Sequence, residues 1–318
     1  MPPADPHRSS DTSAAAIPHG CRRREFLQAA AALPAALMAA QLAQGGSPAA
    51  DKLPQITFGK HSISRLVCGR NPFHGGSHLS TFVNREMHSY YTEEQVLKTL
   101  RRCEEVGINA WQSGPHHLET YYRRHVDAGG KMHFMVIADG NPEPLKKLAA
   151  GGCIAVAHHG EVTDNLFKRG KLDQINDYLK RIRDTGMMVG VSTHMPDVVD
   201  AIESKGWDLD YYMTCIYERH RSEEALKKLL GHVPLPVGEV YLKEDPPRMF
   251  KAIQHTKRPC LAFKILAAGR LSERPDWVAG AFRETFAAIK PTDGAIVGIY
   301  DRYGDQPAED AALVRRFG

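Results

Sequence analysis

Several short apolar runs of this sequence end in side chains that can hold a metal ion or move a proton. Residues 153–160 read CIAVAHHG, an apolar run followed by two adjacent histidines and a glycine. Histidine is seldom fully buried without a partner, and loops at strand ends often carry chemistry. The other runs end in comparable residues: Gln112, His117, Asp139, Ser192, His194, Tyr217, Glu218 and Lys264. Imidazole and carboxylate groups suit divalent metal ions and also acid–base catalysis near neutral pH.

The elements that must position these side chains alternate between apolar runs and helical patterns. A predicted β-hairpin around residues 56–63 precedes eight predicted strands, and capping residues such as Thr92 and Ser222 open helices that end at glycines. Apolar strands that alternate with helices indicate a parallel sheet covered on both faces. Residues 52–318 are therefore predicted to form a single (β/α)8 TIM barrel of the α/β class with an N-terminal hairpin. A doubly wound open sheet is disfavoured, because GRNPFHGG rather than a phosphate-binding glycine turn follows the first strand.

A barrel brings the strand ends together at one rim, where active sites of this architecture lie. We expect the first and eighth strands to pair. The predicted strand ends are Arg70, Gln112, Asp139, His158, Thr193, Tyr217, Leu266 and Ile299. Successive side chains of a strand point to opposite faces, so only one of His158 and His159 can face the barrel axis. Because Ile154 and Val156 share the parity of His158, we expect His158 in the mouth and His159 toward the helices.

Several segments, in the same order along the chain, resemble the aldo-keto reductases. They are the hairpin ITFGKHSISRLVCGRNPF, the strand and helix GMMVGVSTHMPDVVDAI, the strand LDYYMTCIY, the turn FKILAAGRL and the last unit AIVGIYDRYGDQPAEDAALV. The resemblance covers roughly residues 55–316 and implies the same barrel fold. It also implies that, if NADP(H) is bound, Ser192, Tyr217 and Arg302 contact it, with Tyr217 stacked on the nicotinamide.

The catalytic residues of that family are largely replaced in this chain. By position, the family's aspartate becomes Gln112, its proton-donating tyrosine becomes His117, and its lysine falls on Ala138 or Asp139. The family's histidine is retained as His158 or its neighbour. The replacements place two histidines and a carboxylate on adjacent strand ends, a combination common in divalent-metal sites. The predicted metal ligands are His117, Asp139, His158, His194 and Glu218.

These residues favour an enzyme whose reductase site has become a metal site or a His/Asp acid–base site. The candidate catalytic residues are His117, His158, Lys264, Gln112 and Tyr217. A metal could polarise a carbonyl, and Lys264 or a histidine could act as base in an isomerisation, elimination or hydration. A sugar or oxidised sugar is the expected substrate by fold analogy. The alternatives are an NADP-dependent oxidoreductase, in which His117 replaces the tyrosine, and a non-catalytic binding barrel.

The N-terminal segment predicts export. Arg23 and Arg24 precede Phe26, Leu27 and an Ala/Leu-rich stretch at residues 29–43, which resembles a twin-arginine signal followed by a periplasmic or extracellular mature protein. That stretch is too short for a transmembrane helix, so residues 1–44 are assigned to a disordered tail and signal, and no stable membrane anchor is expected after cleavage.

Overall composition is that of an ordinary globular protein. The chain is 42% hydrophobic and 25% charged, with a net charge of +4. The basic residues are scattered rather than clustered, which disfavours a nucleic-acid partner and leaves a small molecule as the expected one. The spacing of the cysteines after the signal predicts core side chains, with neither a disulfide framework nor a zinc site.

Overall fold

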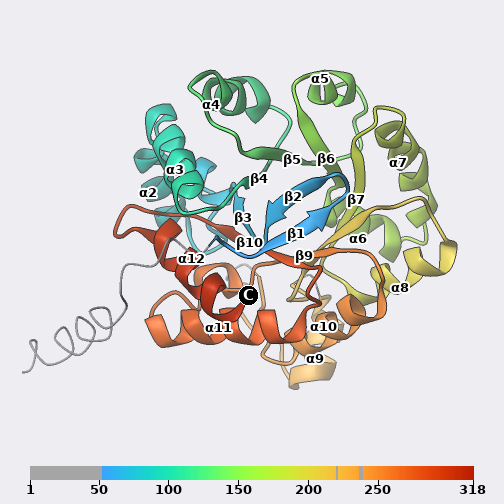
Figure 1. The fold of residues 1–318 in the computed structure, drawn as a ribbon. Helices are drawn as coiled ribbons and strands as arrows, with labels where there is room; N and C mark the ends of the chain where they lie inside the picture. The colour runs from blue at the N-terminus through green and yellow to red at the C-terminus, as the bar shows by residue number, and fades with distance from the viewer. Residues whose placement is uncertain (1–51, 220, 236–238) are drawn as a thin grey trace, which may run out of the picture. The chain divides into compact units, whose positions relative to one another are not determined.

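The computed structural model describes residues 52–219, 221–235 and 239–318, and its centre is a closed barrel of eight parallel strands (Figure 1). The strand order around the barrel is β10-β3-β4-β5-β6-β7-β8-β9. The strands are β3 (Leu66–Gly69), β4 (Ala110–Ser113), β5 (His133–Ala138), β6 (Cys153–His158), β7 (Met188–Thr193), β8 (Tyr211–Cys215), β9 (Cys260–Phe263) and β10 (Gly294–Gly298). The barrel closes where β10 pairs with β3, with Ala295 opposite Leu66. The predicted TIM barrel and the pairing of its first and last strands are thus confirmed.

Every predicted strand end falls within three residues of the observed one. The two largest differences are at β8, which ends at Cys215 rather than Tyr217, and at β9, which ends at Phe263 rather than Leu266. The chain leaves β9 early because Lys264 adopts a left-handed backbone conformation with φ of 60°. That turn begins one wall of the pocket described below.

Helices surround the barrel as an outer layer (Figure 1). The α-helices are α2 (Thr81–Tyr90), α3 (Glu93–Glu105), α4 (Arg123–Asp127), α5 (Leu145–Ala150), α6 (Gly160–Lys168), α7 (Asn176–Arg183), α8 (Pro196–Lys205), α9 (Glu223–Leu230), α10 (Asp245–His255), α11 (Pro275–Ala288) and α12 (Gln306–Phe317). Shorter helical turns are η1 (Asn71–His74), η2 (Leu118–Tyr122), η3 (Leu172–Ile175) and η4 (Ala267–Gly269).

Local capping explains where helices α3 and α9 begin. The Thr92 side chain accepts a hydrogen bond from the Gln95 backbone, and Ser222 accepts one from Ala225, as their sequences predicted. Helix α6 had no such signal and was not predicted, although it carries a residue of the candidate site.

The hairpin of β1 (Gln55–Phe58) and β2 (His61–Ser64) closes the amino-terminal end of the barrel. Phe58 and Ile63 are fully buried and belong to the core cluster inside the barrel. The Phe58 ring lies 4.8 Å from that of Tyr211, the first residue of β8. Burying these two side chains inside the barrel contributes on the order of 3–6 kcal/mol, at about 1.5–3 kcal/mol for each.

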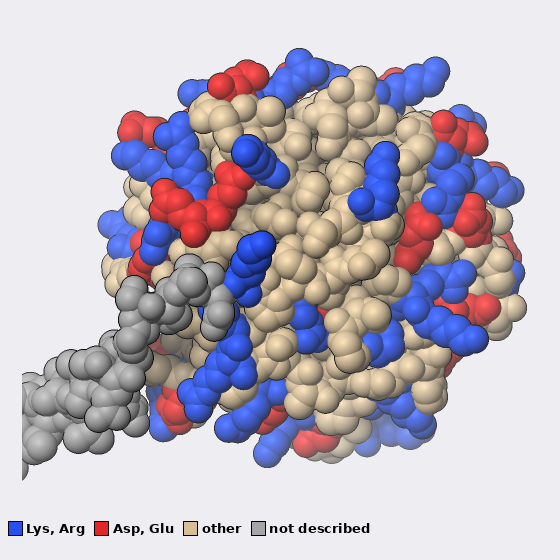
Figure 2. All heavy atoms as spheres, in the orientation of Figure 1, with Lys and Arg blue, Asp and Glu red and all other residues tan. Residues whose placement is uncertain are grey.

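The surface carries no large single-sign patch on the face drawn in Figure 2, where lysines and arginines alternate with aspartates and glutamates around the rim. Among the described residues no helix has both the length and the apolar character to cross a membrane. The five cysteines of the described residues are buried and unpaired, as predicted for core side chains. The predicted signal at residues 1–44 lies outside the described residues.

Candidate active site

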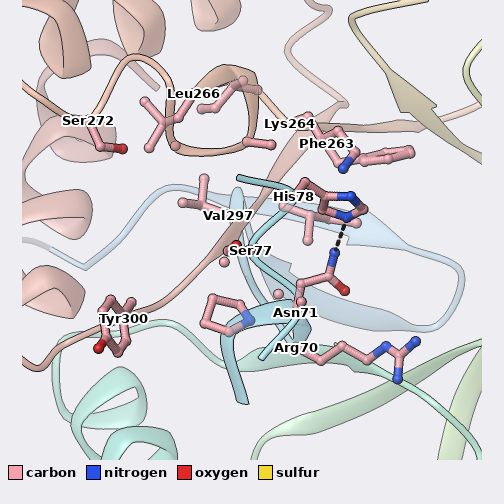
Figure 3. A pocket seen from close by; sticks show the side chains of 18 of the residues that line it. Arg70, Asn71, Ser77, His78, Phe263, Lys264, Leu266, Ser272, Val297 and Tyr300 are labelled. Atoms are coloured by element: carbon pink, nitrogen blue, oxygen red, sulfur yellow. Dashed lines mark hydrogen bonds between the residues drawn. The ribbon is translucent and has the colours of Figure 1, made fainter. Parts of the chain in front are cut away.

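A pocket of about 880 Å³ opens at the carboxyl-terminal ends of the barrel strands. Its inner walls are the ends of β4, β7 and β9, and its outer walls are the segments that follow β3, β9 and β10. Figure 3 labels residues of the outer walls, among them Arg70, Lys264 and Tyr300. A volume of this size is typical of small-molecule and cofactor sites. The pocket therefore occupies the position at which TIM barrels carry out their chemistry.

Buried polar atoms that lack a hydrogen-bond partner converge on this pocket. Among the buried side-chain atoms without a hydrogen-bond partner in the described part of the chain, five belong to residues that line the cavity: Ser192 Oγ, Lys264 Nζ, His159 Nδ1, Arg219 Nε and the Tyr300 hydroxyl oxygen. Leaving a buried donor or acceptor unpaired costs about 1–3 kcal/mol, so native proteins keep few of them. Five such groups around one cavity indicate a site prepared for a polar ligand.

An aspartate–histidine pair forms the inner wall. His194, directly after β7, is 4% exposed, and its Nδ1 donates to Asp164 Oδ2 over 2.7 Å. Asp164 lies on α6 and also accepts from the His194 backbone N–H at 3.0 Å and from Thr193 Oγ1 at 2.5 Å. A carboxylate that accepts from Nδ1 fixes the tautomer in which Nε2 carries the lone pair. Burial lowers the pKa of His194, while Asp164 opposes that change.

Lys264 lies directly after β9, two strands from β7 in the barrel, and the ring of its neighbour Phe263 is 5.5 Å from that of His194. The Lys264 side chain is 8% exposed, and a carboxylate oxygen of Glu239 is 3.8 Å from Nζ, beyond hydrogen-bond distance. Burial, together with the nearby cations Arg219 and Arg270, lowers the pKa of Lys264 to about 7 against an opposing effect of Cys215. A good share of this amine is therefore neutral, and nucleophilic, near neutral pH.

Glu239, in the segment between α9 and α10, contacts several residues beside the pocket. Its carboxylate pairs with Arg219, accepts from the Tyr241 hydroxyl and lies 2.8 Å from His78 Nδ1. The other ring nitrogen of His78 is 3.1 Å from the Asn71 amide, as the dashed line in Figure 3 shows. Burial, followed by the charges of Lys264 and Arg219, lowers the pKa of His78 to about 3. His78 is therefore a neutral ring that donates to Glu239 and accepts from Asn71.

The backbone around the pocket is strained. Non-glycine residues with left-handed φ in the described chain are His78 at 57°, Lys264 at 60°, Ala267 at 48° and Ala268 at 52°. Three of these four line the pocket, and the fourth is adjacent to the lining. Such conformations cost roughly 1–3 kcal/mol each and concentrate at functional sites.

The prediction for the adjacent histidines of β6 is wrong. His158 points away from the pocket into the layer between barrel and helices, where its Nδ1 lies 2.7 Å from Thr163 Oγ1 and its ring packs on Tyr178. His159 lines the pocket instead. The inward-facing residues of β6 are Ala155 and Ala157, so the alternation runs opposite to the predicted parity.

The residues predicted as metal ligands are not brought together. His117 is buried against Trp111, with its Nδ1 2.5 Å from Ser113 Oγ, and Asp139 is exposed. Glu218 pairs with Arg221 and Arg248. Across residues 52–219, 221–235 and 239–318 no group of three or more His, Cys, Asp or Glu side chains is arranged to hold a metal ion. The cluster proposed from His117, Asp139, His158, His194 and Glu218 therefore does not form in this structure.

The remaining predicted residues divide between the pocket and its surroundings. Gln112 and Ser192 line the pocket, with the Gln112 amide donating to the Ser113 carbonyl. Tyr217 packs on Tyr241, with ring centroids 5.1 Å apart, and is not part of the lining. Arg302 also lies outside the lining, where its guanidinium is 3.1 Å from Glu86.

Sequence reasoning missed four residues of the site, namely Arg70, Asp164, Arg219 and Glu239. The sequence analysis identified Arg70 only as the end of the first strand. A cationic residue directly after that strand could also have indicated a binding residue at the barrel mouth. The pKa of Arg70 is lowered by burial, and among the described residues it forms no ion pair. Arg219 and Glu239 meet across a loop, so no local spacing could have connected them.

Comparisons with known proteins identify the fold only. No family model matches the chain, and no curated protein sequence matches it. The fold is similar to that of a glycerol dehydrogenase from Gluconobacter oxydans, at 14% identity and a TM-score of 0.50, over 83% of this chain and 90% of that one. It is also similar to a proposed aldo-keto reductase from Pseudomonas aeruginosa, at 13% identity and a TM-score of 0.52, over 85% and 99% of the two chains. The barrel is thus shared with aldo-keto reductases, as the sequence resemblance implied.

Proposed function

We propose that this chain is a barrel enzyme that moves protons on a small carbonyl or hydroxy compound, in the manner of an isomerase, lyase or hydratase. The observation that carries the proposal is that the Asp164–His194 pair and the amine of Lys264, which has no hydrogen-bond partner among the described residues, belong to the same pocket. A histidine oriented by a carboxylate is a common general base and acid. A metal is not needed for this part of the proposal.

The proposed proton transfers occur between His194 Nε2 and a carbon or oxygen of the substrate. Asp164 holds the ring orientation and stabilises the imidazolium that forms when Nε2 takes a proton. Ser192 and His159 supply polar groups for substrate hydroxyls, and Arg70 supplies a cation for an acidic group. A sugar or an oxidised sugar fits that set of groups, and export through the twin-arginine route would place the enzyme outside the cytoplasm.

Isotope exchange tests the proposal without knowledge of the full reaction. The protein is incubated in D2O with small aldoses, ketoses, sugar acids and 2-oxo acids, and proton NMR follows the C–H signals next to the carbonyl. We expect enzyme-dependent exchange with at least one class, reduced about 10²-fold or more by His194→Gln. His158→Gln is the matched control, because His158 lies outside the pocket. Absence of exchange with every class would contradict the proposal.

A nicotinamide-dependent oxidoreductase is the second candidate, favoured by the length of the pocket. The pocket continues from Ser192 past Leu266 to Tyr300 and Gln306, which is more room than a small sugar needs. The positions of His117 and Tyr217 outside the lining count against it. A fluorescence titration with NADPH tests this candidate, and an unchanged signal at millimolar cofactor would dismiss it.

A further inference from the structure

The amine of Lys264 has an unusual environment for a lysine that serves only as a charge. The side chain is 8% exposed, Nζ has no hydrogen-bond partner among the described residues, and the residue lines the pocket. Figure 3 draws Lys264 beside Phe263 and His78, and both Lys264 and His78 approach Glu239. Lys290, a structural lysine of the same chain, has partners for its amine and does not line the pocket. Lys290 donates to the Ile253 carbonyl at 2.6 Å and lies 3.0 Å from Asp293.

The surroundings of Lys264 favour the neutral form of its amine, and no described residue accepts a hydrogen bond from it. Arg219 and Arg270 are close enough to disfavour a third positive charge, and burial adds to their effect. A lysine that is desolvated and placed next to other cations is an activated nucleophile toward carbonyl compounds. The left-handed backbone at Lys264 directs the side chain from the strand end into the cavity at the expense of strain.

We propose that Lys264 forms a covalent iminium with the carbonyl carbon of an aldehyde or ketone substrate in this pocket. The inference deepens the proposed function and rests on it, since the iminium is the group that makes the neighbouring C–H acidic. Lys264 is then a nucleophile, rather than the base considered from the sequence alone.

The steps balance without any further reactant. The Nζ lone pair forms a C–N bond while the carbonyl π electrons move to oxygen, which gives a positively charged nitrogen and an alkoxide. The nitrogen gives up one proton and the oxygen takes one, so that a neutral carbinolamine forms and the nitrogen regains its lone pair. A second proton converts that hydroxyl into water, which leaves as the nitrogen lone pair forms C=N⁺. Loss of a proton from the adjacent carbon then gives an enamine. We assign the exchange of these protons to His194 Nε2, because the His194 ring lies 5.5 Å from that of Phe263, the residue before Lys264. Water later reverses the addition and releases the product.

Reductive trapping tests the proposal directly on the mature protein. The probes are pyruvate, dihydroxyacetone, glycolaldehyde and D-glyceraldehyde, each with cyanoborohydride at neutral pH, which reduces an iminium to a stable secondary amine. Peptide mass spectrometry then locates the label. The lowered pKa gives Lys264 a free-base fraction about 10³-fold above that of an ordinary lysine, so we expect at least about tenfold faster labelling at Lys264 than at Lys290 or surface lysines. Lys264→Met should abolish the fast label, and Lys264→Arg should not restore it.

The result is read together with the D2O exchange measured on the same preparation. A fast label at Lys264 from any of the four probes supports the proposal. Exchange without a label at Lys264 overturns the iminium and leaves the acid–base function standing. No fast label at Lys264 from any probe and no exchange overturns both. If Lys264→Met lowered solubility, the labelling of wild-type protein, with Lys290 as internal control, would still decide the question.

Discussion

Replacing Lys264 by methionine should stabilise the protein, and should do so most strongly at acidic pH. Among the described residues the amine has no hydrogen-bond partner and is buried, so the folded state carries a cost that the unfolded chain does not. Methionine has similar length and leaves no polar atom to satisfy. Most substitutions of core residues destabilise a protein. A gain in stability would therefore distinguish a costly buried amine from an ordinary core side chain.

The size of the effect follows from the pKa of Lys264, which burial lowers from 10.5 in the unfolded chain to about 7. At 1.36 kcal/mol per pKa unit, this corresponds to about 5 kcal/mol against folding below pH 7, where the amine is charged in both states. Between pH 7 and 10.5 the unfolded chain binds the extra proton, so the stability of the wild type rises with pH. We therefore expect the advantage of Lys264→Met to shrink by about 3 kcal/mol between pH 6 and pH 9.5.

Urea unfolding at pH 6, 8 and 9.5, followed by tryptophan fluorescence and circular dichroism, measures this difference. All other lysines titrate equally in the two proteins and cancel. Lys290→Met is the matched control. That lysine pairs with the fully buried Asp293, so its removal should destabilise the protein at each of these pH values. A pH-independent difference between wild type and Lys264→Met, or a less stable variant at pH 6, would refute the reasoning.

Three further predictions concern the dyad, its packing and the N-terminus. Asp164→Asn should lower D2O exchange by about 10²–10⁴-fold with little change in ligand affinity, because the amide no longer fixes the His194 tautomer; equal losses in rate and affinity by NMR titration would contradict this. Gly160→Ala should cost about 1–3 kcal/mol in urea unfolding and disturb the dyad, since its Cβ would lie 3.1 Å from His194 Cε1; unchanged stability and exchange would count against the described packing. Arg23→Lys combined with Arg24→Lys should retain the precursor in the cytoplasm, as immunoblots of cell fractions would reveal; unaltered export would dismiss the twin-arginine interpretation.

The barrel was predictable because its signals are local. Each strand is a short apolar run, and capping residues such as Thr92 and Ser222 mark helix starts within a few residues. The closure of the barrel was predicted from the number of alternating strand and helix units, not from any single contact. Strand ends were accurate for the same reason, since polar residues appear where each strand leaves the core.

The direction of side chains in β6 was not predictable from the apolar pattern. Both faces of a parallel strand are buried, so apolar residues occur at odd and even positions alike. Here the small residues Ala155 and Ala157 face the narrow interior, while Val156 faces the helices. Larger side chains from other strands, including Met135 and Tyr211, fill the space that the prediction assigned to Val156.

The dyad depended on a contact between distant parts of the chain. His194 was identified from its place after a strand, but Asp164 is 30 residues away on a helix that no capping signal announced. The environment of Lys264 likewise depends on Arg219 and Glu239, which meet only in the folded loop. Residue types at strand ends were therefore visible in the sequence, whereas their partners and charge states required the structure.

The buried hairpin has a consequence for the order in which molecules enter and leave. Because Phe58 and Ile63 close the amino-terminal end of the barrel, a ligand near Lys264 reaches solvent through the strand-end mouth of the described chain. A reaction that splits its substrate must then release the fragment nearer the mouth first and the fragment held at Lys264 last. The product released last binds the same empty site as the substrate, so it should inhibit competitively with the substrate. The product released first binds a site that still holds the other fragment, so it should inhibit non-competitively.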